Sequence, residues 1–336
     1  MTHGDGMLKI AVIGAGHLGA LHAKMLAGIE GVRLTGIFDI DAKKAQAVAG
    51  DCTVPVFRSL DEAIASADAV SIAASTKAHF DIARQALEAD RHVFVEKPMT
   101  ATIEQARMLV ELADQRKRSI QVGHIERFNP AILSLEQYNL NPLFIESHRL
   151  AQFNPRGTDV AVVLDLMIHD IDLILSLVRS RVTRIDANGV AVVSDSADIA
   201  NARLQFENGC VANVTASRIS QNRMRKMRLF QRDAYISIDF AQGMAEVFRI
   251  VDESDPHVHS TMLLGKIEQG TRKRVIVYEQ PEIREVNALK HELELFAQCI
   301  RDGKEPPVTG RDGLQALEVA AEILETIEQQ TITMGS

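Results

Sequence analysis

The feature that most constrains this chain is a glycine-rich turn near its N-terminus. Gly14-Ala15-Gly16-His17-Leu18-Gly19 matches the pattern G-x-G-x-x-G. An apolar, β-branched stretch over residues 9–13 predicts a strand before it, and the Ala- and Leu-rich residues 18–27 predict a helix after it. In this context the glycines allow a tight turn, close approach of a pyrophosphate, and close helix–strand packing. The motif therefore predicts a dinucleotide-binding fold, with phosphates at the helix N-terminus.

The residue expected to select the dinucleotide is Asp39, at the end of a second strand predicted over residues 32–38. It lies 20 positions beyond Gly19, where a carboxylate accepts hydrogen bonds from the adenosine ribose. It would also repel a 2′-phosphate, and no arginine follows it, so NAD is expected and not NADP. The competing interpretation, a plain connector with a surface aspartate, is disfavoured by the spacing.

Strands and helices alternate as far as residue 123. Strands are predicted over residues 69–73, 92–95 and 120–122, and helices over residues 42–49, 79–89 and 102–116. This alternation predicts an α/β doubly wound fold with a parallel sheet and right-handed crossovers. A chain of 336 residues exceeds most single cores. We predict a Rossmann domain over residues 1–124 and a substrate-binding and oligomerisation domain over 125–336, whose last helix is a candidate to pack back on the first.

The pattern changes in the second part. A long helix is predicted over residues 160–177, and closing helices over residues 287–301 and 311–329. Strands are predicted over residues 184–193, 200–206, 211–217, 227–230, 235–240, 245–250 and 274–278. Turn pairs such as Asn208-Gly209 join several of them as hairpins. An antiparallel or mixed sheet is therefore expected.

Composition narrows the class of protein. A net charge of -8 argues against a nucleic-acid partner. Cys52, Cys210 and Cys299 show no CxxC or Cys/His spacing, so we expect a reducing, cytoplasmic location and no metal site. The polar N-terminus predicts no signal peptide. The apolar residues 160–178 contain three aspartates and a histidine, which predicts a buried helix and no membrane partner.

Two clusters suggest chemistry. Lys97 precedes Pro98 at the end of a predicted strand, the edge at which open α/β sheets bind ligands, although most lysines are simply solvated. Asp165 and His169 are four apart on the long helix and so share a face, which Asp172 continues. A histidine with a neighbouring carboxylate is a common general base, but it can also be a packed, capped histidine. The spacing alone leaves both open.

The ordered motifs resemble the Gfo/Idh/MocA oxidoreductases over nearly the whole chain. They are the glycine-rich turn, Glu96-Lys97-Pro98, the segment VGHIERFNP over residues 122–130, and Asp165-x-x-x-His169-x-x-Asp172. The resemblance implies a Rossmann domain followed by an α/β domain on an open, mostly antiparallel sheet, through which these proteins form homodimers or homotetramers. It implies that Lys97, Asp165 and His169 line the nicotinamide–substrate cleft.

The resemblance also implies a cofactor-binding set. It comprises Gly14, Gly16, His17, Leu18, Gly19, Asp39, Ser75, Thr76, His79, Glu96 and Lys97. Two departures from the family pattern stand out. Ser75-Thr76-Lys77 replaces a common Thr-Pro turn, with His79 retained, and His124 replaces a common aromatic residue after Gly123. His124 is therefore a second acid/base candidate, or a residue that shapes the pocket.

Within the family, residues 122–130 and 148–159 most resemble enzymes that oxidise the 3-hydroxyl of UDP-N-acetylglucosamine, on a route to amide-linked lipid A. A nucleotide sugar carries a diphosphate, which arginines bind well. The substrate-binding candidates are His124, Arg127, Asn129, Arg149, Arg156 and Arg218. The basic run over residues 223–228 is a further candidate, or equally a solvated strand face or subunit contact.

The expected reaction is oxidation of a sugar hydroxyl by NAD. Lys97 and His169 would hold and deprotonate the hydroxyl, and Asp165 would orient His169. One alternative substrate is a free sugar or inositol. An alternative of another class is a non-catalytic NAD-binding sensor, which would have no use for Lys97, Asp165 and His169 together. Fold alone does not separate these possibilities.

Overall fold

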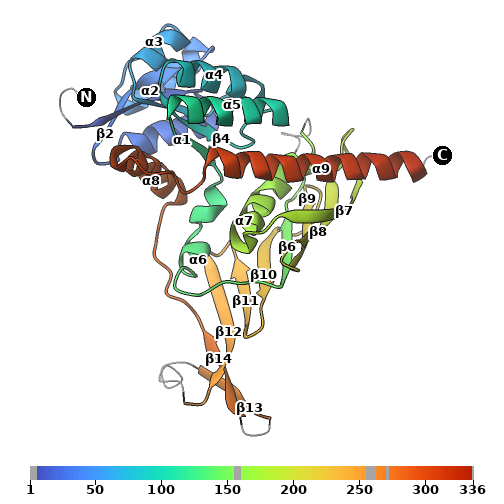
Figure 1. Cartoon of the computed structure of the whole chain (residues 1–336). Helices are drawn as coiled ribbons and strands as arrows, with labels where there is room; N and C mark the ends of the chain where they lie inside the picture. The colour runs from blue at the N-terminus through green and yellow to red at the C-terminus, as the bar shows by residue number, and fades with distance from the viewer. Residues whose placement is uncertain (1–5, 155–159, 255–261, 270–271, 335–336) are drawn as a thin grey trace. The chain divides into compact units, whose positions relative to one another are not determined.

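The computed structural model describes residues 6–154, 160–254, 262–269 and 272–334. Contacts divide the chain into two compact units (Figure 1). The first comprises the chain up to Ile125 together with Val286–Glu318, and the second comprises Glu126–Glu285 and the chain from Val319 onward. The domain boundary predicted after residue 124 remains a proposal, and these units add that a late segment, Val286–Glu318, belongs with the N-terminal part.

The first unit is built on a parallel five-stranded sheet in the order β2-β1-β3-β4-β5. The strands are β1 (Leu8–Ile13), β2 (Val32–Phe38), β3 (Ala69–Ile72), β4 (His92–Glu96) and β5 (Ile120–Gly123). Every residue of β3 and of β5 is buried. Such continuous burial arises when helices cover both faces of a parallel sheet. The predicted Rossmann fold is confirmed.

Helices alternate with these strands and join them. They are α1 (His17–Leu26), α2 (Ala42–Cys52), α3 (Leu60–Ala65), α4 (Thr76–Glu88) and α5 (Ile103–Arg116). The late segment of this unit adds α8 (Ala288–Asp302). Side-chain oxygens cap several of the helices, as when Thr102 accepts a hydrogen bond from the amide of Gln105 at the start of α5. The helices α4 and α5 pack side by side (Figure 1). Helix α8 packs on α1 through Leu293, Phe296 and Ala297, which are fully buried.

The second unit is built on a nine-stranded sheet in the order β13-β14-β12-β11-β10-β6-β9-β8-β7. Its strands are β6 (Phe144–Leu150), β7 (Val182–Val190), β8 (Ile199–Phe206), β9 (Val211–Ser217), β10 (Met224–Phe230), β11 (Ala234–Asp239), β12 (Met244–Asp252), β13 (Met262–Gln269) and β14 (Arg272–Glu279). Only the pair β6–β9 is parallel among these described strands. The predicted mostly antiparallel sheet is confirmed.

Short helical segments cover one face of this sheet. They are η1 (Ile125–Phe128), α6 (Pro130–Leu133), η2 (Val163–Met167) and α7 (Ile168–Val178). Contacts of α7 with β6 and β9, and of α6 with β11 and β12, place them on the face whose alternate side chains are buried. The long closing helix is α9 (Gly310–Met334).

The structure differs from the sequence predictions in several elements. Strands β6 and β13 and the short helical segments η1 and α6 were not predicted. The helix predicted over residues 160–177 is not a uniform α-helix, because its first part, η2, is a π-helical turn. Among the described residues, no helix is both long enough and apolar enough to cross a membrane.

Candidate cofactor and active site

The glycine-rich turn leaves room for a ligand at one position and none at the two others. A Cβ at Gly14, where φ is +101°, would lie 2.5 Å from the carbonyl oxygen of Ala73, and a Cβ at Gly19 would lie 1.9 Å from that of Gly14. A Cβ at Gly16 would meet no atom within 4 Å. Gly14 and Gly19 therefore let the turn and helix α1 pack closely, while Gly16 exposes its backbone. This geometry fits the approach of a cofactor phosphate.

The start of α1 is suited to negative charge. Gly16 is its N-cap and brings no side-chain hydrogen bond, and the first turn holds no acidic residue. No side chain of the cap therefore competes for the amides of His17 and Leu18. Backbone amides and the helix dipole together favour an anion at such an end.

Asp39 follows β2 and fastens the turn. Its Oδ2 accepts a hydrogen bond of 2.6 Å from the amide of Ala15, and its Oδ1 accepts one of 2.8 Å from the amide of Asp41. Each carboxylate oxygen has a second lone pair that a ribose hydroxyl can use. The predicted ribose contact therefore remains compatible with the position of Asp39.

The segment Glu96-Lys97-Pro98 lies at the carboxyl end of β4, the edge predicted for ligand binding. The Oε1 of Glu96 contacts the Nε2 of His22 at 2.9 Å, and a Cβ at Gly123 would lie 2.9 Å from the Glu96 carboxyl group. The peptide bond between Lys97 and Pro98 is cis. His22 thus holds the side chain of Glu96, the residue immediately before Lys97.

His79 lies in the first turns of α4, close to Ser75 and Thr76. Its ring contacts the carbonyl oxygens of Pro98, at 3.0 Å, and of Ala74, at 3.1 Å. It is buried, and burial lowers its pKa despite these contacts. Its surroundings favour a role in supporting the strand ends over a direct contact with the cofactor. Ser75, the N-cap of α4, makes no side-chain capping bond.

In the second unit, Asp165 lies within the π-helical turn η2 and His169 lies in the first turn of α7. Both are half-buried. Short π-helical turns occur frequently at functional sites, because the extra residue in the turn changes the direction of nearby side chains. The rule that residues four apart share a face applies to a regular α-helix, and it cannot be applied directly to Asp165 and His169.

Asp172, predicted to continue the stripe of Asp165 and His169, is instead fully buried against Arg127. The Nε of Arg127 donates to Oδ2 at 2.8 Å, and its Nη2 donates to Oδ1 at 2.5 Å. This two-pronged pair joins α7 to η1. The guanidinium of Arg127 is therefore engaged by Asp172. The contact of Arg127 with substrate stays a prediction.

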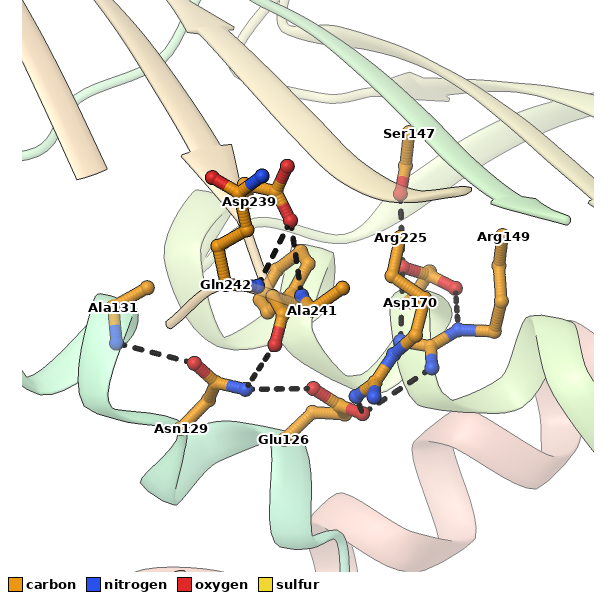
Figure 2. A network of polar contacts seen from close by, with 11 residues as sticks. Glu126, Asn129, Ala131, Ser147, Arg149, Asp170, Arg225, Asp239, Ala241 and Gln242 are labelled. Atoms are coloured by element: carbon orange, nitrogen blue, oxygen red, sulfur yellow. Dashed lines mark hydrogen bonds and ion pairs between the residues drawn. The ribbon is translucent and has the colours of Figure 1, made fainter. Parts of the chain in front are cut away.

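Glu126 and Asp170 form a second, larger buried network (Figure 2). The Nε of Arg149 donates to Asp170 at 2.6 Å, its Nη1 donates to Glu126 at 3.2 Å, and Ser147 donates to Asp170 at 2.8 Å. Burial disfavours the charge of Arg149, but the two carboxylates outweigh it and raise the pKa of the guanidinium. Arg149 thus binds α7 to β6, which argues against its predicted contact with a diphosphate.

Asn129 also has a local role. Its Oδ1 accepts a hydrogen bond from the amide of Ala131 and caps α6, while its Nδ2 donates to the carbonyl oxygen of Phe240 at 3.2 Å (Figure 2). His124 is buried directly after β5. Its predicted contact with substrate, like that of Asn129, remains a prediction.

The remaining arginine candidates are distributed differently. Arg156 lies outside the described residues. Arg218 is buried and donates to the carbonyl oxygen of Val160, with Asp198 3.9 Å from its Nε. In the basic run, Arg225, Lys226 and Arg228 pair with acidic partners, namely Glu126, Asp239 and Glu146. The run is therefore largely neutralised, as expected of a strand face and not of an anion site.

Sequence reasoning gave no role to His22, Ser71, Glu126 and Asp170. Asp170 carried a signal, because a carboxylate on so apolar a helix requires a partner. His22 carried none, since one histidine in an Ala- and Leu-rich helix resembles any core histidine. Its partners, Ser71 and Glu96, lie 49 and 74 positions away.

A Rossmann sheet with this glycine-rich turn, followed by an open mixed sheet, defines a dinucleotide-dependent oxidoreductase. The model of the oxidoreductase family with an NAD-binding Rossmann fold matches residues 8–124, and that of the GFO/IDH/MocA C-terminal domain matches residues 134–245. The chain belongs to the Gfo/Idh/MocA oxidoreductases, NAD-dependent dehydrogenases that act on CH–OH groups.

Curated relatives match over almost their full length. The UDP-N-acetylglucosamine 3-dehydrogenase of Acidithiobacillus ferrooxidans is 35% identical, over 96% of this chain and 97% of the relative. The NAD-dependent scyllo-inositol 2-dehydrogenase of Bacillus subtilis is 26% identical, over 93% of this chain and 92% of the relative.

Solved structures agree with this assignment. A structure of the Acidithiobacillus enzyme has a TM-score of 0.86 and 34% identity, covering 96% of this chain and 98% of that chain. A scyllo-inositol dehydrogenase from Lactobacillus casei, with bound NAD(H) and scyllo-inositol, has a TM-score of 0.75 at 20% identity, covering 96% of this chain and 98% of that chain. The second match supports the fold alone.

Proposed function

We propose that this chain is a cytoplasmic enzyme that oxidises the 3-hydroxyl of UDP-N-acetylglucosamine to a ketone, as a step towards amide-linked lipid A. The observation that carries the proposal is the 35% identity to an enzyme of that name over 96% of the chain, against 24–26% for the inositol dehydrogenases that match over a similar length. The motif at residues 122–130 supports the same substrate.

In the proposed reaction, bound NAD⁺ supplies the hydride acceptor. The open backbone at Gly16, the amides that begin α1 and the carboxylate of Asp39 hold the cofactor. Lys97 and His169 hold the sugar hydroxyl and remove its proton. Asp165 orients His169 and stabilises its protonated form, as a carboxylate beside a general base does.

Several of the arginines that were predicted to bind the diphosphate are paired with carboxylates. Arg149 and Arg127 are engaged by buried carboxylates, and the basic run is paired along its strand. We therefore assign these three groups to support of the substrate domain. Among the predicted cationic ligands, Arg156 keeps the proposed role of binding the nucleotide diphosphate.

The test is a direct assay of NADH formation, followed by the absorbance of the reduced nicotinamide at about 340 nm. UDP-N-acetylglucosamine should be oxidised with a kcat/KM at least about 100-fold above that for myo-inositol. Preferential oxidation of inositol would overturn the substrate and keep the reaction class. If calorimetry detects NAD binding but no alcohol is oxidised, the chain is a sensor and the proposal fails.

We further propose that the chain forms a homodimer or homotetramer through the second unit. The face of the nine-stranded sheet opposite α7 carries a row of half-exposed aromatic rings, one each on β6, β10, β11, β12 and β14. Neighbouring ring centroids are 5.0–5.7 Å apart, and the residues are Phe144, Phe230, Tyr235, Phe248 and Tyr278. A contiguous apolar row on an otherwise charged sheet is typical of a subunit interface.

A further inference from the structure

Two buried histidines contact the residues that flank Lys97 in the chain. His22 comes from α1 and His79 from α4, and they are 0% and 1% exposed. His22 contacts the residue before Lys97, and His79 contacts the residue after it. Helix faces of this kind are normally packed with apolar side chains, because burying an imidazole requires hydrogen-bond partners. Each histidine has such partners on both ring nitrogens.

His22 fixes the side chain of Glu96. Its Nε2 contacts the Oε1 of Glu96 at 2.9 Å, and its Nδ1 contacts the hydroxyl of Ser71 at 2.8 Å. A carboxylate only accepts, so the ring carries a proton on Nε2 and donates it to Glu96. The edge of the His22 ring also packs on Phe94, with 5.3 Å between centroids. Gly123 provides the room for the Glu96 carboxyl group on its other side.

His79 fixes the backbone that follows Lys97. Its Nδ1 lies 3.0 Å from the carbonyl oxygen of Pro98 and its Nε2 lies 3.1 Å from that of Ala74, the second residue after β3. A neutral imidazole has one N–H, and we assign that proton to Nδ1, which then donates to Pro98. Neither histidine is part of the glycine-rich turn or of the motif that contains His169.

We propose that His22 and His79 are positioning residues, which hold the Glu96 side chain before Lys97 and the Pro98 backbone after it and thereby direct the Lys97 ammonium group. This inference rests on the role proposed above for Lys97. A lysine side chain has four rotatable bonds, so its direction depends on a fixed backbone. A displacement of about 1 Å at a reacting group is enough to reduce a rate about 100-fold.

Paired substitutions separate positioning from packing. The amide nitrogen of glutamine corresponds to Nε2 of histidine and that of asparagine to Nδ1, so His22→Gln keeps the donor to Glu96 and His22→Asn loses it. We expect kcat within about threefold of wild type for His22→Gln and about 10- to 100-fold lower for His22→Asn, with KM nearly unchanged. Ser71→Ala, which removes only the other contact of His22, is the matched control and should keep kcat.

The order reverses at His79. Here His79→Asn keeps a donor for the Pro98 carbonyl oxygen and His79→Gln does not, so His79→Asn should be the more active variant. A histidine that only fills space would show no such reversal, since glutamine and asparagine differ in the same way at both positions. Equal losses for the two substitutions at both sites would overturn the inference.

A second readout needs no substrate. Trace acylation of the folded protein, followed by mass spectrometry, measures the reactivity of Lys97 relative to that of Lys44, whose side chain is 63% exposed. We expect His22→Asn and His79→Gln to change this ratio at least about threefold, by altering the placement described above, and the paired variants to preserve it. An unchanged ratio in all four variants would overturn the inference.

The two readouts also distinguish this inference from the proposed function. If the labelling ratio responds as expected while the wild-type protein oxidises no sugar nucleotide, the positioning of Lys97 is supported and the proposed substrate is wrong. If the wild type oxidises UDP-N-acetylglucosamine but neither kcat nor labelling follows the paired pattern, the function is supported and the positioning is wrong.

Discussion

Asp39 accepts hydrogen bonds from backbone amides through both of its oxygens, and so it holds the turn in addition to its proposed contact with the cofactor. Asp39→Asn keeps the shape of the side chain and one acceptor oxygen but removes the charge. We expect the KM for NAD to rise about tenfold, because a hydrogen bond to a charged group is worth about 1.5–3 kcal/mol. We also expect the ratio of kcat/KM values for NADP and NAD to rise, because the repulsion of a 2′-phosphate is lost. Steady-state kinetics with both cofactors measure this, and an unchanged ratio would contradict the assignment.

His169 is the residue to which we assign removal of the proton. His169→Ala should lower kcat about 10²- to 10⁴-fold, the usual contribution of a positioned base. The Kd for NAD should stay within about twofold, since the groups proposed to bind the cofactor are residues 14–19 and Asp39 and do not include His169. Asp165→Asn should show an intermediate loss because it leaves the base in place. Calorimetry and the NADH assay test these values, and normal turnover by His169→Ala would remove it from the mechanism.

At the level of elements, the helix that carries His169 shows where sequence reasoning succeeds and fails. Its polar residues correctly indicated that an apolar helix must satisfy buried charge. The partners were not predicted: Asp170 and Asp172 pair with arginines that lie 21 and 45 positions away. Neither those distant partners nor the π-helical turn can be recognised from a spacing of four.

Strand β6 was missed for a related reason. Its buried residues are Ile145, Ser147 and Arg149, so the face towards the core is not apolar. The polar pair is buried because Asp170 meets it from α7. The Rossmann strands are mostly apolar, although β2 carries the exposed Arg33 and β5 the buried Gln121, and they could be predicted almost to the residue. A strand whose core face is an ion-pair network has no such pattern.

The pair between Arg127 and Asp172 is expected to matter for stability. The side chains are 14% and 0% exposed, so removing either partner leaves a charge in a nearly dry environment. Arg127→Met or Asp172→Leu should each lower the free energy of unfolding by about 3–5 kcal/mol, and the double substitution should recover most of this loss. The exposed pair Arg184–Asp186, in the same unit, is the control, and removing either of its partners should change the free energy of unfolding far less. Urea unfolding measures the two single variants, the double variant and the control, and additive losses would contradict the expectation.

Asp198 closes the loop between β7 and β8 and gives a pH-dependent prediction. Burial acts to raise its pKa, but hydrogen bonds from the amides of Val192, Val193 and Ser194 and from the Ser194 hydroxyl hold the pKa well below its ordinary value. An aspartate with a depressed pKa stabilises the fold at any pH above its pKa in the unfolded chain, which is about 3.9. This stabilisation is lost as the pH falls further, towards the pKa in the folded protein.

The difference in unfolding free energy between wild type and Asp198→Asn should therefore be largest above about pH 5 and shrink below about pH 4. Urea unfolding of both proteins from about pH 3 to about pH 7 covers the range in which an aspartate titrates. A difference that stays constant as the pH falls would show that the charge of Asp198 is not the stabilising feature.

For the whole molecule, the aromatic row on the open sheet face leads to a prediction about assembly. Phe248→Glu places a charge in the middle of the row, between Tyr235 and Tyr278. A charge buried without a partner at an interface costs several kcal/mol, about 2–5, so the assembly should dissociate. Light scattering after size-exclusion chromatography measures the mass. An exposed substitution elsewhere, such as Met108→Glu on α5, is the control and should leave the mass unchanged.

The return of a late segment to the first unit also affects how the protein is made. The core that contains Ile10, Leu26 and Phe94 is completed by Leu293 and Phe296, and the amide of Val122 bonds to the carbonyl oxygen of Val308. The ribosome therefore releases all five strands of the sheet before it synthesises the residues of α8 that complete this core. At about 5–20 residues per second, translation of the intervening segment takes roughly 10–30 s. During this interval the nascent N-terminal half exposes apolar surface, so shortened gene fragments that end before α8 should yield protein that aggregates in the cell.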